Sequence, residues 1–211
     1  MNGRIRFVVL SLVATVGLTA PVSRLRYRFE RITVLFAMSL IVIWFGILPF
    51  LMPAFIREDL SNLETRLDAG GICYQTTAYT CGPAAAVTAL GEMGITAEEG
   101  ELAILSHSTP ITGTLPSCLT GAINKRYGNL GLKCRYQYFD SISQLGEYET
   151  VLAVVKDSLL TDHCIAVLGL EDGFVKVADP VYGKVSVRRE EFKRMWRYSG
   201  IIFERSLASR I

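Results

Sequence analysis

The sequence predicts an α+β domain in which helices come first and pack on an antiparallel sheet built from later strands. Residues 81–128 show helical periodicity, whereas residues 132–187 hold short runs rich in β-branched and aromatic side chains. Segregated helices and strands are typical of α+β folds rather than of doubly wound sheets. The chain has 211 residues, which leaves room for one domain of ordinary size behind an apolar N-terminal segment.

The N-terminal residues 1–56 predict a membrane anchor of two transmembrane helices, at about 7–23 and 32–55. The second helix lies within 25 consecutive uncharged residues, which suffice to cross a hydrocarbon core of about 30 Å. The first helix is shorter, and because two arginines precede it, it also fits a signal peptide. An uncleaved helical hairpin is the favoured interpretation.

The orientation of this anchor follows from its charges. The connection between the two apolar stretches contains Arg24, Arg26, Arg28 and Arg31. Positive charge favours the cytoplasmic side, so the connection predicts a multi-pass protein of the inner (plasma) membrane with an extracytoplasmic C-terminal domain. Other arginines, near the N-terminus and after the second stretch, favour the opposite orientation.

The segment 57–71 predicts a linker helix that ends at a Gly-Gly pair, so that the domain proper covers residues 72–211. Thr96 suits the N-cap of the second domain helix, with Glu99 three residues later to complete a capping box. The predicted helices of this first part of the domain cover residues 81–93, 96–106 and 113–128.

The rest of the domain is predicted to be mainly strands. Glu171–Gly173 has the composition of a hairpin turn between the third and fourth strands. A final helix over 189–197 and a last strand over 200–205 complete the domain. The five strands before them cover residues 132–139, 151–156, 163–170, 174–179 and 183–187.

Composition and charge exclude several function classes. The formal net charge is +2, which gives no basic footprint for nucleic acid binding. The five cysteines form no CxxC pair and the chain has two histidines, so the usual spacing of a structural zinc site is missing. We therefore expect no metal, no other cofactor and no nucleic acid partner.

Cys81 is the candidate nucleophile. It opens the first domain helix in the stretch "CGPAAA", where the positive end of the helix dipole favours a thiolate. Gly82 permits a sharp turn, Pro83 suits the first helical turn, and the alanines allow close packing against a sheet. A structural cysteine at a helix start explains the same residues. This stretch alone therefore does not distinguish a nucleophile from a structural cysteine.

A cysteine nucleophile needs a general base, an orienting group and oxyanion donors. His163 begins an apolar strand and is the candidate base, whereas His107 lies in a polar loop. Asp179 ends the neighbouring strand, and the hairpin brings it close to His163, so it is the candidate orienter. Gln75, six residues before Cys81, is the candidate oxyanion donor together with the backbone N–H of Cys81.

From about residue 72 to 205 the chain resembles the papain-like cysteine peptidases that process bacteriocins and other double-glycine leader peptides. The resemblance lies in "YQTTAYTCGPAAAVTAL", Gly113-Thr114, "HCIAVLGL", "VKVADPVYGKVSV" and "EEFKRMW". It implies a papain-like domain with Cys81 as the nucleophile and His163 as general base and acid. It further implies that Asp179 orients the histidine and that Gln75 is an oxyanion donor.

The order of the parts differs from that of the best-known family members. In those proteins the peptidase domain precedes the membrane helices and the ATPase of an exporter, whereas here it follows the predicted helices. The chain contains no GxxxxGK[ST] loop, so no ATPase domain is predicted within it. An exporter would therefore be a separate partner protein.

The sequence thus predicts a membrane-anchored cysteine peptidase that cleaves a peptide or leader sequence through a Cys-His-Asp triad and an acyl-enzyme intermediate. A peptide or protein is the expected substrate. One alternative is an acyl transferase or amidase that uses the same triad and passes the acyl group to an amine. The other is a non-catalytic papain-like domain that binds a peptide at the membrane.

Overall fold

The computed structural model describes residues 17, 22, 27–158 and 161–205. The chain forms two compact units, Met1–Phe55 and Ile56–Ile211. In the first unit no residue of the first described helix, α2, is buried, and large apolar side chains on it are exposed. The described helical segments of this unit are α2 (Arg28–Val42), the π-helix η2 (Ile43–Ile47) and α3 (Leu48–Phe55).

The predicted membrane hairpin is not shown by this structure. Among the described residues, no helix is both long enough and apolar enough to cross a lipid bilayer. The predicted span 32–55 is divided among α2, η2 and α3. The predicted span 7–23 lies outside the described residues except for Gly17 and Val22. The two-helix anchor therefore stays a prediction from the sequence.

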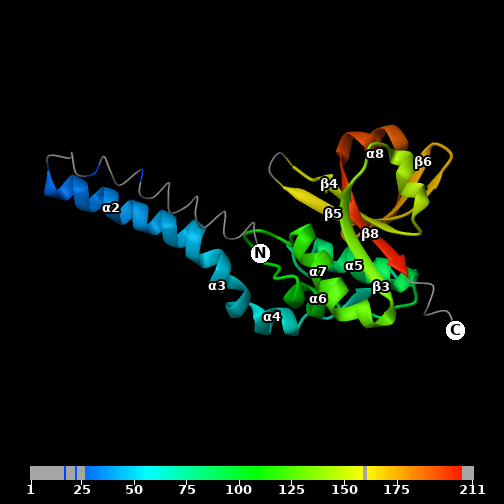
Figure 1. Cartoon of the computed structure of the whole chain (residues 1–211), viewed down its shortest axis with the longest axis horizontal. Coiled ribbons are helices and arrows are strands. Elements are labelled where there is room, and N and C mark those ends of the chain that lie inside the picture. The colour runs from blue at the N-terminus through cyan, green and yellow to red at the C-terminus, as the bar shows by residue number, and fades with distance from the viewer. Residues whose placement is uncertain (1–16, 18–21, 23–26, 159–160, 206–211) are drawn as a thin grey trace. The chain divides into compact units, whose positions relative to one another are not determined.

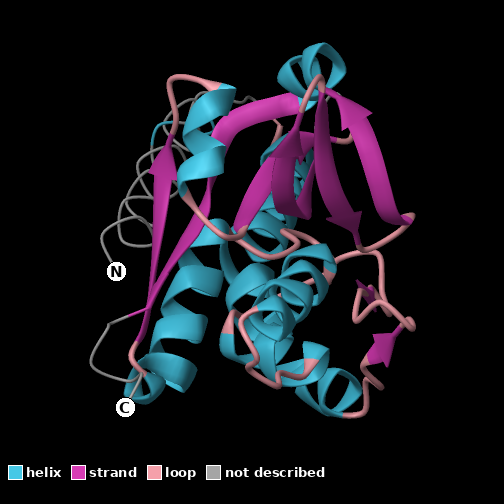
Figure 2. Ribbon diagram, turned by 90° about the vertical axis from the view of Figure 1, so that its right-hand side faces the viewer, coloured by secondary structure: helices cyan, strands magenta, loops and turns pink. Residues whose placement is uncertain are grey.

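The second unit is the predicted α+β domain (Figure 1). Its six-stranded sheet has the order β3-β8-β4-β5-β6-β7, and all neighbouring strands are antiparallel. Figure 2 shows this sheet covered by a layer of helices. The strands are β3 (Leu132–Tyr138), β4 (Val151–Lys156), β5 (Asp162–Glu171), β6 (Phe174–Asp179), β7 (Gly183–Arg188) and β8 (Trp196–Arg205).

Helices cover both sides of the sheet. The larger group lies on one side and α8 on the other (Figure 1). The larger group consists of α5 (Cys81–Glu92), α6 (Glu99–Leu105) and α7 (Pro116–Tyr127), and α8 covers Arg189–Met195. Two short 3₁₀ helices, η3 (Gly128–Leu130) and η4 (Ile142–Glu147), lie in connections.

The sheet has two apolar faces because its side chains alternate along each strand. In β4, Leu152 packs in the core on the α5 side, together with the buried alanines of that helix. Its neighbours Val151 and Ala153 pack on the opposite face with Phe192 and Trp196. The runs of small residues in α5 and of β-branched residues in the strands therefore build two cores with the sheet between them.

The predicted linker helix over 57–71 is shorter than expected. Helix α4 covers Arg57–Ser61, and the chain then forms a two-stranded sheet of β1 (Arg66–Leu67) and β2 (Cys73–Tyr74). Leu60 of α4 is 1 % exposed, and its carbonyl oxygen lies so near Gly100 that a Cβ there would collide with it. Helix α4 thus packs closely on α6 and belongs to the compact unit Ile56–Ile211.

The predicted capping box at the start of α6 is wrong. The helix begins at Glu99 with Glu98 as its N-cap and has no side-chain cap. The Glu99 carboxylate instead accepts hydrogen bonds from Thr76, which comes from a different segment of the chain. The predicted last helix is also shorter, because the backbone becomes extended at Trp196 and starts β8 there.

Gly100→Ala should destabilise the domain, because the added Cβ would collide with the Leu60 carbonyl oxygen. Overpacking of this kind costs about 1–3 kcal/mol. Gly121→Ala on α7 is the matched control, since its Cβ would meet no atom within 4 Å, and it should stabilise by up to about 1 kcal/mol. Urea unfolding followed by circular dichroism measures both. Equal midpoints for the two variants would contradict the close contact between α4 and α6.

Candidate active site

Cys81 is the first residue of α5, as predicted, and Thr80 is the N-cap. The Thr80 hydroxyl bonds with the side chain and backbone of Thr77, so the turn before Cys81 is fixed. Cys81 is half-buried. Its thiol is free, and so are the thiols of the other four cysteines. Because the first N–H groups of a helix have no partner within it, the Cys81 backbone can donate to a substrate oxygen.

Gly82 is required by close packing rather than by a sharp turn, since it lies within α5. A Cβ at this position would lie 3.2 Å from the Thr114 Cβ and 3.3 Å from Leu119 Cδ2. The Thr114 hydroxyl in turn bonds with Ser108 at 2.6 Å and donates to the Tyr79 carbonyl oxygen at 3.2 Å. The loop before α7 is thus held directly against the start of α5.

The candidate base and orienter, His163 and Asp179, lie on neighbouring strands and touch. The His163 Nε2 and Asp179 Oδ1 atoms are 3.0 Å apart. The predicted hairpin is confirmed, since β5 and β6 are antiparallel with Glu171 opposite Phe174. The hairpin therefore brings the far ends of the two strands together, as the sequence predicts.

A β-bulge in β5 sets the side of the sheet on which the two side chains meet. The register shifts between Val167 and Gly169. When the register beyond the bulge is extended, Asp179 lies opposite Ile165, two residues from His163 and therefore on the same face. Without the extra residue the strand would slip by one position, and the two side chains would point to opposite faces.

The Asp179 carboxylate is fixed by the turn that follows it. Its Oδ1 accepts hydrogen bonds from the backbone N–H groups of Val181 at 2.7 Å and Tyr182 at 3.4 Å. Burial alone would raise the pKa of this carboxyl group. The hydrogen bonds from His163 and from the Val181 N–H outweigh burial and lower the pKa of Asp179 below its ordinary value. The carboxylate is therefore charged at neutral pH.

The third member of the group is Cys81, whose sulfur lies close enough to the His163 ring to contribute to the shift of its pKa. Since Nε2 faces Asp179, Nδ1 is the ring nitrogen left for the sulfur. Burial disfavours a charged ring, but the hydrogen bonds and negative charges of Asp179 and Cys81 raise the pKa of His163 to about 10. A histidine beside the sulfur supplies the base that a cysteine nucleophile requires.

The backbone of Gln75 is hydrogen-bonded next to Asp179. Its N–H donates to the carbonyl oxygen of Pro180, the residue after Asp179, at 2.9 Å. The preceding Tyr74 places its phenol oxygen over Gly183, whose φ of 78° lies in the left-handed region. The Gln75 side-chain oxygen is buried and has no hydrogen-bond partner among the described residues.

His107 and three other cysteines are not members of the Cys81–His163–Asp179 group. His107 lies in the loop after α6 with a φ of 55°, and its backbone N–H donates to Ile104. Burial raises the pKa of both Cys73 and Cys134 to about 12. Burial, followed by the charges of Cys81 and Asp179, also raises the pKa of Cys164. These three cysteines are neutral thiols at physiological pH, unlike a nucleophile.

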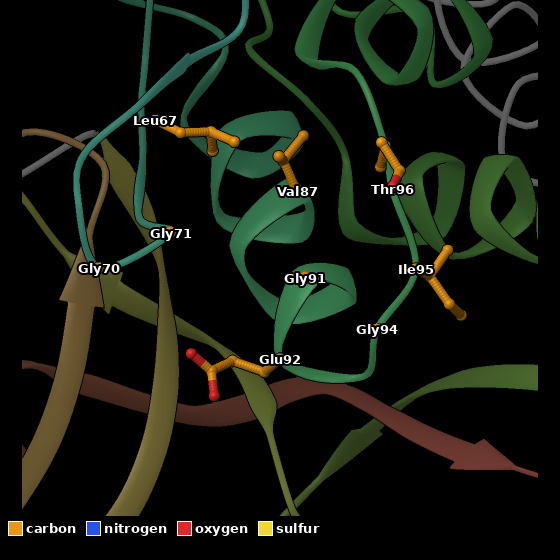
Figure 3. Close-up of a pocket in the computed structure, with 10 residues that line it drawn as sticks. Leu67, Gly70, Gly71, Val87, Gly91, Glu92, Gly94, Ile95 and Thr96 are labelled. Atoms are coloured by element: carbon orange, nitrogen blue, oxygen red, sulfur yellow. The ribbon is translucent and has the colours of Figure 1, made fainter.

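A pocket of about 330 Å³ lies at the other end of α5 (Figure 3). Val87, Gly91 and Glu92 line it from that helix. Glu92 closes the helix that Cys81 opens, which at 1.5 Å per residue puts them about 16 Å apart along the axis. The lining contains none of the predicted site residues. The remaining lining residues are Leu67, Gly70, Gly71, Gly94, Ile95, Thr96 and Ala97.

The same region of the chain matches known proteins. The sequence pattern of the peptidase C39 family matches residues 71–207. The chain belongs to the peptidase C39 family. This is a family of cysteine peptidases. The match includes the segment from Cys81 to Asp179, which contains the candidate triad, and Gln75 before it.

Two relatives are uncharacterized proteins of Methanothermobacter. The protein of Methanothermobacter thermautotrophicus is 28 % identical over 143 residues, which cover 68 % of this chain and 94 % of the relative. The protein of Methanothermobacter marburgensis is 28 % identical over 147 residues, which cover 70 % of this chain and 97 % of the relative. The similarity therefore extends over nearly the full length of both relatives.

Solved structures of peptidase domains share the fold. A double glycine motif protease from an AMS/PCAT transporter, solved in complex with the leader peptide, gives a TM-score of 0.53 at 16 % identity and covers 68 % of this chain and 93 % of that one. The peptidase domain of Streptococcus ComA gives a TM-score of 0.54 at 22 % identity and covers 63 % of this chain and 96 % of that one. The predicted papain-like α+β fold is thus confirmed.

Asp179→Asn should lower the pKa of His163 from about 10, because the carboxylate charge and hydrogen bond hold the proton on the ring. NMR titration of the imidazole signals measures this, and His107→Gln leaves His163 as the single histidine. Asp172→Asn in the exposed β5–β6 turn is the control and should leave the pKa unchanged. A His163 pKa that is equal in both variants would contradict the pairing.

The same shift predicts how stability depends on pH. Because the pKa of His163 is raised on folding, its contribution is complete below the unfolded value of about 6.5. That contribution is lost as pH rises through about 10. Asp179→Asn should therefore reduce the difference in unfolding midpoint between pH 6 and pH 10, as read by urea unfolding.

Proposed function

We propose that this chain is a cysteine peptidase that cleaves a peptide or leader sequence through an acyl-enzyme intermediate. The observation that carries the proposal is the 3.0 Å contact of the His163 ring with Asp179, next to Cys81 at the start of α5. One ring thus joins a nucleophile to an orienting carboxylate, which is the arrangement that nucleophilic catalysis requires.

In the first half of the reaction, the Cys81 thiolate attacks the carbonyl carbon of the scissile peptide bond. The carbonyl oxygen becomes an oxyanion, which the Cys81 backbone N–H and the Gln75 side-chain amide stabilise as donors. The His163 imidazolium then gives its proton to the leaving amine as the carbon–nitrogen bond breaks. The N-terminal part of the peptide remains attached to the sulfur as a thioester.

In the second half, neutral His163 takes a proton from a water molecule that attacks the thioester carbon. The oxyanion forms again at the same donors, and the carbon–sulfur bond breaks. The peptide leaves as a carboxylic acid, which loses its proton to the solvent, and the imidazolium–thiolate pair is restored. Throughout, Asp179 keeps the ring in the orientation that presents Nδ1 to the sulfur.

A peptide is the proposed substrate for two reasons. One structurally similar protein, the AMS/PCAT protease, was solved in complex with its leader peptide. In the present chain, segments that carry triad contacts also bear exposed apolar side chains, which suit the apolar side chains of an extended or helical peptide. These are Leu115 beside Thr114, and Val181 and Tyr182 after Asp179.

We also propose that residues 1–56 anchor the enzyme to the inner (plasma) membrane, with the peptidase domain on the extracytoplasmic side. The run of 25 uncharged residues supports this proposal. Exposed apolar side chains on α2, such as Phe29, Ile32 and Phe36, support it as well. An anchored enzyme would meet its substrate at the bilayer surface.

Cys81→Ala should abolish peptide cleavage while leaving the domain folded, as circular dichroism can check, because the sulfur forms the covalent intermediate. Cys118→Ala removes another half-buried cysteine and should keep full activity. Mass spectrometry of double-glycine peptides incubated with each variant gives the measurement. Fragments whose masses sum to substrate plus one water identify hydrolysis, whereas an amine adduct would identify acyl transfer. Cleavage by Cys81→Ala would refute the nucleophile assignment.

The anchor is tested by cell fractionation of the full chain and of a variant that lacks residues 1–56. The full chain should stay with the membranes after a carbonate wash, and the shortened one should not. Added protease should digest the domain in spheroplasts with an intact inner membrane. Release of the full chain by carbonate would contradict the anchor, and protection in spheroplasts would contradict the orientation.

A further inference from the structure

We infer that Glu99 is a positioning residue, whose buried carboxylate fixes Thr76 and thereby holds the neighbouring Gln75 as an oxyanion donor. The inference rests on the proposed acyl-enzyme function and deepens it. It assigns a role in catalysis to a residue on α6, outside the triad and outside the helix that carries the nucleophile.

The contact between Glu99 and Thr76 is made by both carboxylate oxygens. Oε1 accepts a hydrogen bond from the Thr76 backbone N–H at 2.8 Å. Oε2 accepts one from the Thr76 hydroxyl at 2.6 Å. Glu99 is 0 % exposed, so water does not compete for these two hydrogen bonds. Both the main chain and the side chain of Thr76 are therefore fixed.

Glu99 is itself held firmly in place. Its backbone N–H donates to the Thr65 hydroxyl at 3.0 Å. The next residue, Gly100, lies against the carbonyl oxygen of Leu60 on α4. The carboxylate therefore extends from a rigid part of the domain to the loop that precedes the nucleophile.

Gln75 is fixed on its other side by the triad. Its own N–H donates to Pro180, next to Asp179, at 2.9 Å. Its backbone thus lies between two fixed contacts, one to the orienter turn and one through Thr76 to Glu99. Because the side-chain oxygen of Gln75 has no partner among the described residues, the direction of the amide group depends on where the backbone is held.

The Thr76 contact should affect only those reactions of Cys81 that form an oxyanion. An oxyanion donor acts only when it already points at the site where charge develops, and loss of one donor costs about 10²–10³ in rate. Loss of the Thr76 contact should therefore slow the reactions of Cys81 that form an oxyanion. A direct displacement at the same sulfur forms no oxyanion and should keep its rate.

Thr76→Val is the test, because valine has nearly the shape of threonine and lacks the hydroxyl. Two probes are compared on the full-length protein at pH 7, with labelling at Cys81 quantified by peptide mass spectrometry. p-Nitrophenyl acetate acylates the sulfur through an oxyanion, whereas iodoacetamide alkylates it by displacing iodide. We expect Thr76→Val to lower acylation about 10- to 100-fold and to change alkylation less than about twofold.

Two further variants separate positioning from a general loss of structure. Thr76→Ser keeps the hydroxyl and should restore acylation to within about threefold of the parent protein. In the Gln75→Ala background, Thr76→Val should have no further effect on acylation, since the donor that it positions is gone. Equal losses of acylation and alkylation, or losses by Thr76→Val and Gln75→Ala that multiply, would overturn the inference.

The outcomes also keep this inference apart from the proposed function. If Cys81 of the parent protein is not acylated at all, the nucleophile assignment fails, and the positioning role fails with it. If the parent and Thr76→Val are acylated equally, only the role of Glu99 and Thr76 is wrong. Glu99→Gln, which keeps an acceptor for the Thr76 N–H, should then also match the parent.

Discussion

A charged imidazole held between a carboxylate and a sulfur is the interaction on which the rest of this structure depends. Burial opposes the charge on His163, yet the pKa of the ring is raised to about 10 because Asp179 and Cys81 face it from two sides. A buried charge without partners is costly, so each member of the group needs the other two in place. The backbone N–H groups after Asp179 complete the arrangement by fixing its carboxylate.

The fold supplies that arrangement from two rigid parts. The β5–β6 hairpin, with its bulge, places His163 and Asp179 side by side. Helix α5 supplies Cys81, and its run of alanines is fully buried against the sheet. Small residues are needed here because a larger side chain would push the helix, and the sulfur with it, away from the ring.

The positions of the site residues that depend on local sequence patterns could be predicted from the sequence. Cys81 was predictable because Pro and alanines after it signal a helix start, and His163 and Asp179 because a hairpin turn lies between their strands. The capping box at Thr96 was mispredicted because its pattern also fits a glutamate that is buried against another segment. The partner of Glu99, Thr76, lies 23 positions away, and no local rule connects the two.

The length of the linker was mispredicted for a related reason. Its residues have helical propensity, but Leu60 is buried against α6, and the chain must then leave the helix to pair β1 with β2.

The proposed oxyanion donor, Gln75, is held in place differently from the three candidate triad residues. The triad residues sit at the ends of regular elements, whose hydrogen bonds fix them. Gln75 follows the two-residue strand β2 and has no such support. Its position therefore has to come from tertiary contacts, which Pro180 provides from the triad and Glu99 provides through Thr76. A single short loop thus joins the orienting carboxylate to the helical layer, so a displacement of either part would reach the oxyanion site.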